Sequence, residues 1–221
     1  MTRALTLHDI ADLRAYERER PEFRARVIAL KKRRRVGVGP FVTLVFENRD
    51  TIRFQIQEMA RVEKLFRDEQ ILDELAAYNP LIPEPGQLRA TLFIELTSDE
   101  QMREWLPALV GIQRRVALRL DDGVELRAAP DPSHQEQLTR EDEVTASVHY
   151  IGWDLDDEQV ASFVGSSNVE LVIDHERYRH STPLSAATCD ELRADLVADC
   201  DGGADTAVAD GDADEKSGES Q

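Results

Sequence analysis

Apolar residues along this chain recur at two different spacings, which predicts a mixture of helices and strands. A helix is expected to begin at Thr6, where a capping box opens an apolar face. A second helix is expected after Pro21, because Phe23 and Val27 lie four residues apart and Pro suits a first helical turn. This second helix is predicted to end before Gly37.

A β-hairpin is predicted immediately afterwards. Residues 41–46 form a continuous apolar run, and residues 51–57 alternate between apolar and polar side chains. We therefore expect these two segments to pair, with a turn between them. The polar face of the second strand would then consist of Arg53, Gln55 and Gln57.

The rest of the chain reads as alternating strands and helices. Helices are predicted at 68–78 and 97–106, after the acidic cap at 156–159, and at 188–197; strands are predicted at 88–96, 115–120, 124–129, 144–155 and 169–174, with a polar loop at 130–143. The sequence Asp-Asp-Gly between the second and third of these strands is a strong hairpin signal.

This order of elements predicts an α+β fold, with a helical N-terminal segment and a mainly antiparallel β-sheet of about five to seven strands with helices packed on one face. We expect a single α+β domain over residues 1–185 and a terminal helix over residues 186–199. Residues 200–221 are predicted to form a disordered acidic C-terminal tail, because they carry too few apolar side chains to offset the entropy of ordering.

Charge is distributed unevenly along a chain whose net charge is −17. Residues 20–35 hold eight basic residues and one acid, whereas residues 190–221 hold eleven acids and two bases. The basic helix face, represented by Arg24 and Lys31, could dock an acidic partner, a phosphate group or the chain's own tail, or could simply be solvated. Nucleic-acid binding through residues 20–35 is a less favoured alternative, because the chain as a whole is acidic.

The two cysteines, Cys189 and Cys200, have neither CxxC nor zinc-ligand spacing. Free thiols fit a reducing cytoplasm, so a cytoplasmic location is expected. No membrane association is predicted, because no run of 18 apolar residues and no signal-peptide pattern occurs.

Side chains suited to holding a ligand or partner are concentrated after the apolar run: Arg53, Gln55, Gln57, Glu58, Arg61 and Glu63. In one hypothesis Arg53 and Arg61 clamp an anionic small molecule and Glu58 acts as general acid or base. In another hypothesis these charges form weak surface ion pairs. The sequence leaves open whether the protein is an enzyme.

A metal site is a weaker alternative. His149, Asp174 and His175 fall on or at the end of predicted strands and are of the types that bind divalent metals. Strand histidines are more often hydrogen-bonded core residues, and the spacing of His175 and His180 does not match a helical zinc motif. We therefore predict no cofactor.

The runs RFQIQEM and YNPLIP, together with SVHYIGWDL and VIDH, resemble the bacterial domain-of-unknown-function family DUF3501. The resemblance covers roughly residues 5–180, and the acidic extension after about residue 185 departs from shorter members. The family has no established activity, so no catalytic residue can be carried over.

Gene neighbourhoods of the family imply an accessory role in a redox or peroxide-defence system that contains rubrerythrin-like and iron–sulfur proteins. The resemblance thus favours a non-enzymatic interaction protein whose partner is an iron–sulfur or di-iron redox protein. The metal would belong to that partner, because the chain lacks paired Glu-x-x-His motifs and cluster cysteines. The oligomeric state is not predicted.

Overall fold

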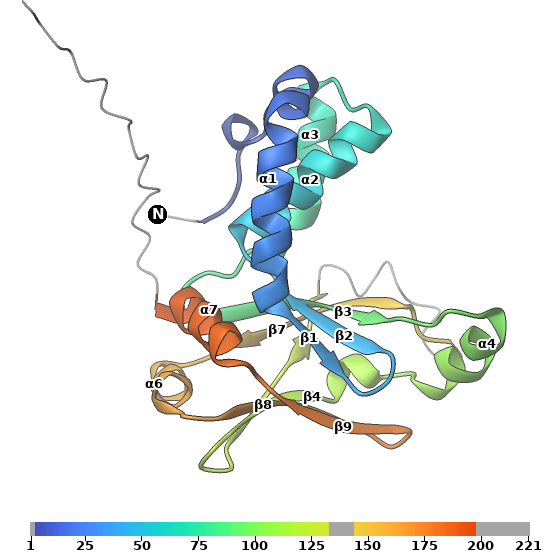
Figure 1. Ribbon diagram of the computed structural model, residues 1–221, viewed down its shortest axis with the longest axis vertical. Helices are drawn as coiled ribbons and strands as arrows, with labels where there is room; N and C mark the ends of the chain where they lie inside the picture. Colours follow the sequence, from blue (N-terminus) through green and yellow to red (C-terminus); the bar gives the residue numbers. More distant parts are fainter. Residues whose placement is uncertain (1–2, 133–143, 198–221) are drawn as a thin grey trace, which may run out of the picture.

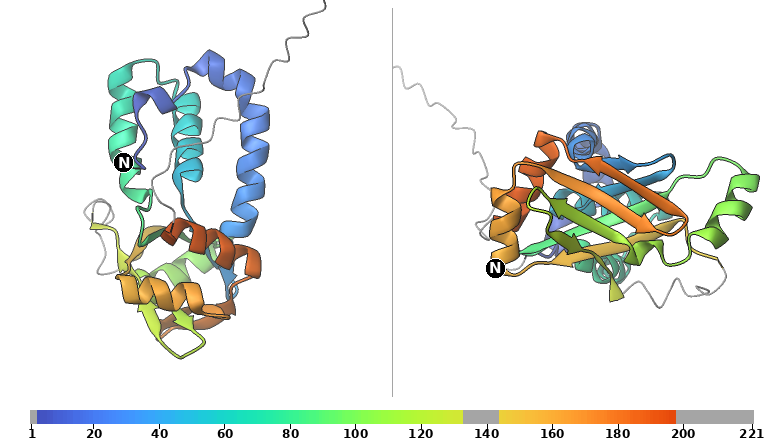
Figure 2. Two further views of the ribbon diagram at one scale, coloured as in Figure 1. Left: turned by 90° about the vertical axis from the view of Figure 1, so that its left-hand side faces the viewer. Right: turned by 90° about the horizontal axis from the view of Figure 1, so that it is seen from below.

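Two antiparallel β-sheets pack face to face, and three helices stand on the outer face of one of them (Figures 1 and 2). This is a computed structural model, and it describes residues 3–132 and 144–197. The α+β class is confirmed, but the described strands form two sheets instead of one.

The first sheet, which we call sheet A, has five strands in the order β1-β2-β3-β7-β6, and sheet B has four in the order β5-β4-β8-β9. Their bounds are β1 (Arg35–Val38), β2 (Val42–Phe46), β3 (Gln87–Ile94), β4 (Val116–Leu120), β5 (Glu125–Arg127), β6 (Ala129–Pro130), β7 (Val148–Asp154), β8 (Val169–His175) and β9 (Tyr178–Pro183).

The helices form two groups. Helices α1, α2 and α3 form an upright helical arm on sheet A, whereas α7 lies at the foot of α1 and contacts β3 and α6 (Figure 1). The helix bounds are α1 (Leu13–Arg34), α2 (Arg49–Glu63), α3 (Asp68–Tyr78), α4 (Asp99–Ala108), α6 (Asp157–Gly165) and α7 (Ala186–Val197), with short 3₁₀ turns η1 (Leu7–Asp9), η2 (Asn79–Leu81) and η3 (Ile112–Arg114).

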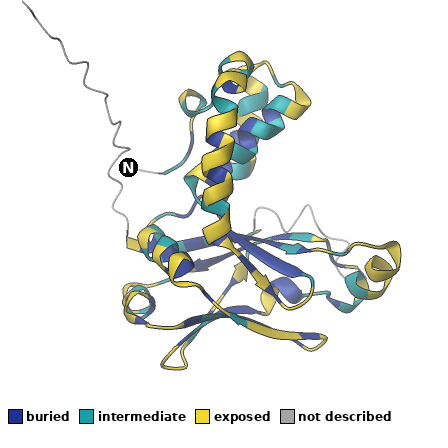
Figure 3. Ribbon diagram, viewed as in Figure 1, coloured by how far each residue is buried: buried dark blue, intermediate teal, exposed yellow. Residues whose placement is uncertain are grey.

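The largest core lies between the sheets, where the strands carry many buried residues (Figure 3). Most strands contribute alternate residues to this core. Leu44, Leu92 and Ile151 of sheet A meet Leu118 and Leu171 of sheet B in this core. Two smaller hydrophobic clusters stabilise the helical arm. One packs α2 and α3 against the N-terminal segment, and the other lies between α1 and α2. The arm meets sheet A at its lower end, so helices cover only part of the outer face of this sheet (Figure 1).

Helix α1 is continuous through Pro21, so the predicted break into two helices is wrong. The Asp12 side chain caps α1 by accepting hydrogen bonds from two backbone N–H groups of its first turn. Tyr16, Phe23 and Val27 extend one buried stripe across the proline. This packing offsets the destabilisation by an internal proline, which removes one helix hydrogen bond and costs about 3 kcal/mol. The predicted capping box at Thr6 is present, but it opens only η1.

The hairpin predicted from residues 41–57 is wrong. Strand β2 pairs with β1 and β3, and the expected second strand is part of α2. The Asn48 side chain accepts a hydrogen bond from the Thr51 backbone N–H, which starts the helix, and Ile52 and Ile56 share its buried face at a spacing of four. The alternating pattern of residues 51–57 is compatible with both strand and helix periodicity. The cap at Asn48 favours the helix.

Other elements also differ from the sequence-based expectation. The sequence does not predict β1, and the strand predicted at 124–129 is divided between β5 of sheet B and β6 of sheet A. Strand β8 is followed by a further strand, β9, so it is not the last. Strand β7 is shorter than predicted, and α7 begins before Thr188 because Ser185 caps it. Most of the predicted polar loop and the predicted disordered tail over residues 200–221 lie outside the described residues.

Candidate functional site

The predicted cluster of polar residues lies on helix α2, and its members point in different directions. Arg53 and Gln57, four residues apart, both face the N-terminal part of the chain. The Arg53 Nε atom donates to the Asp9 carbonyl at 2.7 Å, and its Nη2 donates to Glu19 at 3.2 Å. Gln57 is fully buried and exchanges two hydrogen bonds with the Ala11 backbone. Both side chains therefore use hydrogen-bonding groups in contacts within the protein.

Glu58 and Arg61 complete this contact between α1 and α2. Arg20 donates to both carboxylate oxygens of Glu58, at 2.7 and 2.9 Å, and the Tyr16 hydroxyl donates at 2.7 Å. Arg61 Nε lies 2.6 Å from Glu17. The hydrogen bond from Arg20 holds the pKa of Glu58 below its ordinary value. A general acid or base at neutral pH needs the opposite shift, so this geometry favours a structural role for Glu58.

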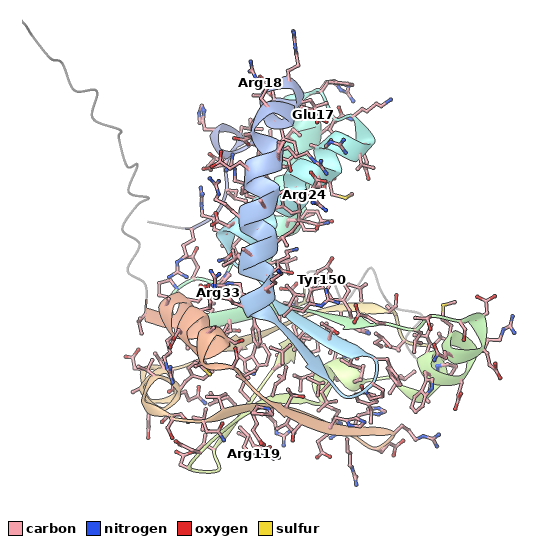
Figure 4. The ribbon with its side chains drawn as sticks, in the orientation of Figure 1. Glu17, Arg18, Arg24, Arg33, Arg119 and Tyr150 are labelled. Carbon is pink, nitrogen blue, oxygen red and sulfur yellow. The ribbon has the colours of Figure 1, made fainter. Side chains whose placement is uncertain are left out.

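The remaining predicted residues are separated from this contact. Arg24 is exposed on α1, about half-way up the helix (Figure 4), and Glu63 is exposed near the end of α2. Gln55 and Lys31 instead line a cavity above sheet A. The six residues predicted to form one polar cluster are therefore distributed between a helix interface, a cavity and open surface.

Part of the basic run over residues 20–35 is used to attach helix α7. Arg34 is only 2% exposed, and it pairs with Asp195 at 2.7 Å and Glu191 at 3.0 Å. Arg33 also reaches Glu191, at 2.6 Å. Burial raises the pKa of Asp195, and the Arg34 guanidinium opposes that rise. The acidic residues that begin the C-terminal region thus meet the basic end of α1.

The three metal candidates do not come together. His149 lies in sheet A, where its Nε2 is 2.9 Å from the Thr145 hydroxyl. Asp174 and His175 lie in sheet B, where Asp174 pairs with Arg179 and His175 Nε2 contacts a backbone carbonyl at 3.1 Å. Within residues 3–132 and 144–197, no three His, Cys, Asp or Glu side chains form a group that could hold a metal ion.

A cavity of about 300 Å³ lies where the helical arm meets the outer face of sheet A. Sheet A contributes Arg35, Val45, Thr91, Phe93, Val148 and Tyr150, and Glu47 directly follows β2. The helical arm contributes Lys31, Ile52, Gln55 and Tyr78, and η2 contributes Leu81. Figure 4 places Tyr150 beside the foot of α1. We call this the arm–sheet cavity.

Strand register explains why these side chains share one face. Val45 of β2 pairs with Thr91 of β3, which pairs with Tyr150 of β7. Residues opposite one another in a sheet point to the same side, so these three side chains form a row across the floor. Glu47 lies two residues beyond Val45 and therefore points to the same side.

Glu47 is the most unusual group in the arm–sheet cavity. It is only 6% exposed, and the Thr91 hydroxyl donates to its Oε1 atom at 2.7 Å. Within the part of the chain that the structure describes, no Lys, Arg or His forms an ion pair with it. Buried carboxylates are costly unless paired, so a nearly buried carboxylate beside a cavity marks a candidate binding site.

Two tyrosines extend the polar surface of the cavity around Glu47. Burial raises the pKa of Tyr150, and the nearby Tyr78 and Glu47 raise it further. Burial also raises the pKa of Tyr78, while a hydrogen bond from the Gln55 side chain lowers it. Both phenols are therefore protonated at neutral pH and can donate hydrogen bonds.

The sequence pattern predicts only a turn after residue 46 and does not single out Glu47. A signal was present, because this carboxylate directly follows a five-residue apolar strand, where a buried position is expected to continue. Thr91 and Tyr150 could not be grouped with it, because their proximity depends on the pairing of β2, β3 and β7.

Comparison with known proteins is consistent with this architecture. Residues 4–196 match the family model described as "Protein of unknown function (DUF3501)". The chain belongs to the DUF3501 family. The resemblance expected from the motifs RFQIQEM and YNPLIP is thereby confirmed, and the match extends into α7.

A solved structure supports the fold of this DUF3501 chain. The crystal structure of a novel protein of unknown function from Burkholderia pseudomallei K96243 is 36% identical, with a TM-score of 0.81. The comparison covers 87% of this chain and 99% of that one. No curated protein matches the chain. Among the described residues, no helix has the length and apolar character needed to span a membrane.

Proposed function

We propose that this protein binds a small organic molecule in the arm–sheet cavity. The observation that carries the proposal is Glu47, a carboxylate that is 6% exposed, accepts a hydrogen bond from the Thr91 hydroxyl and lies at a cavity of about 300 Å³. A ligand that donates hydrogen bonds to the second carboxylate oxygen would complete its coordination.

The composition of the cavity wall supports small-molecule binding. Ligand sites combine apolar and aromatic walls with a few converging polar groups, and volumes of about 300 Å³ lie at the lower end of their range. Val45, Phe93 and Val148 supply apolar surface from sheet A, while Gln55 and Tyr78 supply polar groups from the helices. Two of the predicted ligand-binding residues, Gln55 and Lys31, thus contribute to this cavity.

The test is equilibrium dialysis of the purified protein against a pooled extract of small cellular metabolites, followed by mass spectrometry of the retained compounds. The variant Val148→Trp would fill the cavity, and Val62→Trp on exposed helix surface is the matched control. We expect the wild type and Val62→Trp to retain the same compounds and Val148→Trp to lose them. Identical retention by all three proteins would contradict the proposal.

A second candidate function is docking of an acidic protein on α1. Arg24 is exposed, and within the described chain it forms no ion pair, so its charge is accessible to a partner. This observation supports docking of an acidic partner, and the family resemblance implies that such a partner is an iron–sulfur or di-iron redox protein. The buried thiol of Cys189, which is free, is compatible with action in a reducing cytoplasm.

Charge reversal at Arg24 tests docking without altering the arm–sheet cavity, whereas reversal at Lys31 alters both. We expect Arg24→Glu to weaken retention of an iron–sulfur or di-iron partner in a pull-down, and unchanged retention would count against docking there. Salt-sensitive binding of DNA or RNA to the wild type, lost in Arg24→Glu, would instead favour the nucleic-acid alternative.

A further inference from the structure

We propose that the ligand of the arm–sheet cavity is a small zwitterion, with an ammonium group that binds Glu47 and an anionic group that binds Lys31. This inference rests on the proposed ligand-binding function and adds the chemical class of the ligand. It follows from the placement of opposite charges that line one cavity without pairing with each other.

The ammonium end is assigned from the surroundings of Glu47. A carboxylate can accept about four hydrogen bonds, and here the Thr91 hydroxyl supplies one. An ammonium group has three donors and a full positive charge, so it satisfies a nearly buried carboxylate better than a neutral donor does. Tyr78 and Tyr150 line the same cavity, and the electron-rich faces of tyrosine rings attract cations.

The anionic end is assigned from Lys31, which is half-buried at the same cavity. Its Nζ atom lies 6.0 Å from the centroid of the Phe54 ring, and it forms no ion pair within the described residues. The other cation of the cavity wall, Arg35, already pairs with Glu95. Lys31 is therefore the cation that remains available to an anionic group.

The separation of the two charges sets a scale for the ligand. No salt bridge joins Lys31 to Glu47 within the described chain, so their charged atoms are more than 4.0 Å apart. A molecule whose ammonium and anionic groups are joined by a short chain would bridge them. Phe93 and Val148 leave apolar surface beside the two charges, which favours a ligand that also carries an aromatic or aliphatic side group.

The experiment compares three probes with the same phenylethyl skeleton by isothermal titration calorimetry: phenylalanine, 2-phenylethylamine and 3-phenylpropionate. They share an aromatic ring and carry both charges, only the ammonium group or only the carboxylate. We expect phenylalanine to bind most tightly, 2-phenylethylamine about 10-fold more weakly, and 3-phenylpropionate more weakly again.

Two variants assign the ends of the ligand. Glu47→Gln keeps the shape but removes the charge, and we expect it to weaken phenylalanine and 2-phenylethylamine binding by about 10-fold or more. Lys31→Met should remove the advantage of phenylalanine over 2-phenylethylamine and leave the amine unaffected. Lys32→Met, on the exposed neighbouring position, is the matched control and should bind all three probes like the wild type.

Several results would overturn the zwitterion assignment: equal affinity for the three probes, tightest binding of 3-phenylpropionate, no binding of phenylalanine, or unchanged affinities in Glu47→Gln. Results that refute the zwitterion assignment can be distinguished from results that refute ligand binding in the arm–sheet cavity. Retention of a compound without an ammonium group in the dialysis experiment, sensitive to Val148→Trp, would leave ligand binding intact and refute only the class. Retention of compounds independently of Val148→Trp would refute the function itself.

Discussion

Glu47, which directly follows strand β2, accepts a 2.7 Å hydrogen bond from the hydroxyl group of Thr91 on the neighbouring strand β3. The same type of contact occurs at the other end of this antiparallel strand pair, where the hydroxyl group of Thr43 on β2 donates at 2.7 Å to Glu95, which directly follows β3. Both threonines are nearly buried, but Glu95 is exposed and also pairs with Arg35. This pair of contacts separates the effect of carboxylate burial from the effect of the hydrogen bond.

The first prediction compares Thr91→Val with Thr43→Val. Thr91→Val leaves a nearly buried carboxylate without its donor, so we expect a loss of about 1–3 kcal/mol in the free energy of unfolding. Thr43→Val should cost about 1 kcal/mol or less, because Glu95 remains exposed to water and retains its ion pair with Arg35. Urea unfolding monitored by circular dichroism measures both. Equal losses of unfolding free energy in the two variants would contradict this prediction, because they would show that water solvates Glu47 to the same extent as Glu95.

The second prediction concerns the attachment of α7 to α1. Arg34→Met leaves Asp195 and Glu191 without their buried partner, and we expect a loss of about 3–5 kcal/mol in stability. Arg33→Met removes an exposed cation from the same Glu191 and should cost about 0–1 kcal/mol. Thermal and urea unfolding of both variants check this difference, and a similar cost for the two would contradict it.

The third prediction is a pH dependence. The pKa of Glu58 is lowered in the folded state, chiefly by the hydrogen bond from Arg20, so its contribution to stability is fully present above its unfolded pKa of 4.5 and is lost as pH falls through the folded value. At pH 7 we expect Glu58→Gln to be less stable than the wild type by about 1–3 kcal/mol.

That difference should shrink in urea titrations performed at successively lower pH below 4.5. Glu63→Gln is the control, because Glu63 is exposed and has no ion pair within the described chain. Its stability should follow the wild type at every pH. A deficit in Glu58→Gln that persists unchanged into acid would show that the ionised carboxylate is not the stabilising species.

The fourth prediction tests the turn between β1 and β2. Gly39 has a φ of +73°, and a Cβ atom there would lie 2.5 Å from the Tyr178 hydroxyl, which itself donates to the Val38 carbonyl at 2.6 Å. Gly123 has a similar φ of +86° but open space around it. Both alanine variants carry the left-handed backbone cost of about 1–2 kcal/mol.

Gly39→Ala should lose about 1–3 kcal/mol more than Gly123→Ala, because the added methyl group displaces Tyr178 from the β1–β2 turn. Differential scanning calorimetry measures the two melting temperatures. If the two variants melt together, the contact between Gly39 and Tyr178 does not constrain the position of β9 against β1.

The sequence predicted those elements that carry their own local signals. Asp156 caps α6 as expected, α4 lies close to the helix predicted at 97–106, and the Asp-Asp-Gly turn joins β4 to β5. Local signals gave the wrong element over residues 51–57, where the apolar pattern is compatible with both strand and helix periodicity. They also failed at Pro21, where contacts of α1 with α2 outweigh a local helix breaker.

The arm–sheet cavity was beyond sequence reasoning for a different reason. Its floor depends on the cross-strand neighbours Val45, Thr91 and Tyr150, whose register is set by pairing of strands that are distant in sequence. The sequence singles out Gln55 as part of a polar strand face and Lys31 as part of a basic helix face. Their position at this cavity follows from α2 being a helix, not from the strand that was predicted.

The most direct test of the central claim is a methyl-resolved NMR titration of the isotope-labelled protein with a library of small polar aromatic and aliphatic fragments. Ligand binding in the arm–sheet cavity predicts shifts of the Ile52, Leu81 and Val148 methyl signals, with Leu118 in the core between the sheets unchanged, and loss of the shifts of amine-bearing fragments in Glu47→Gln. Absence of shifts at the cavity methyl groups, or shifts confined to the exposed face of α1 around Ile28, would contradict it.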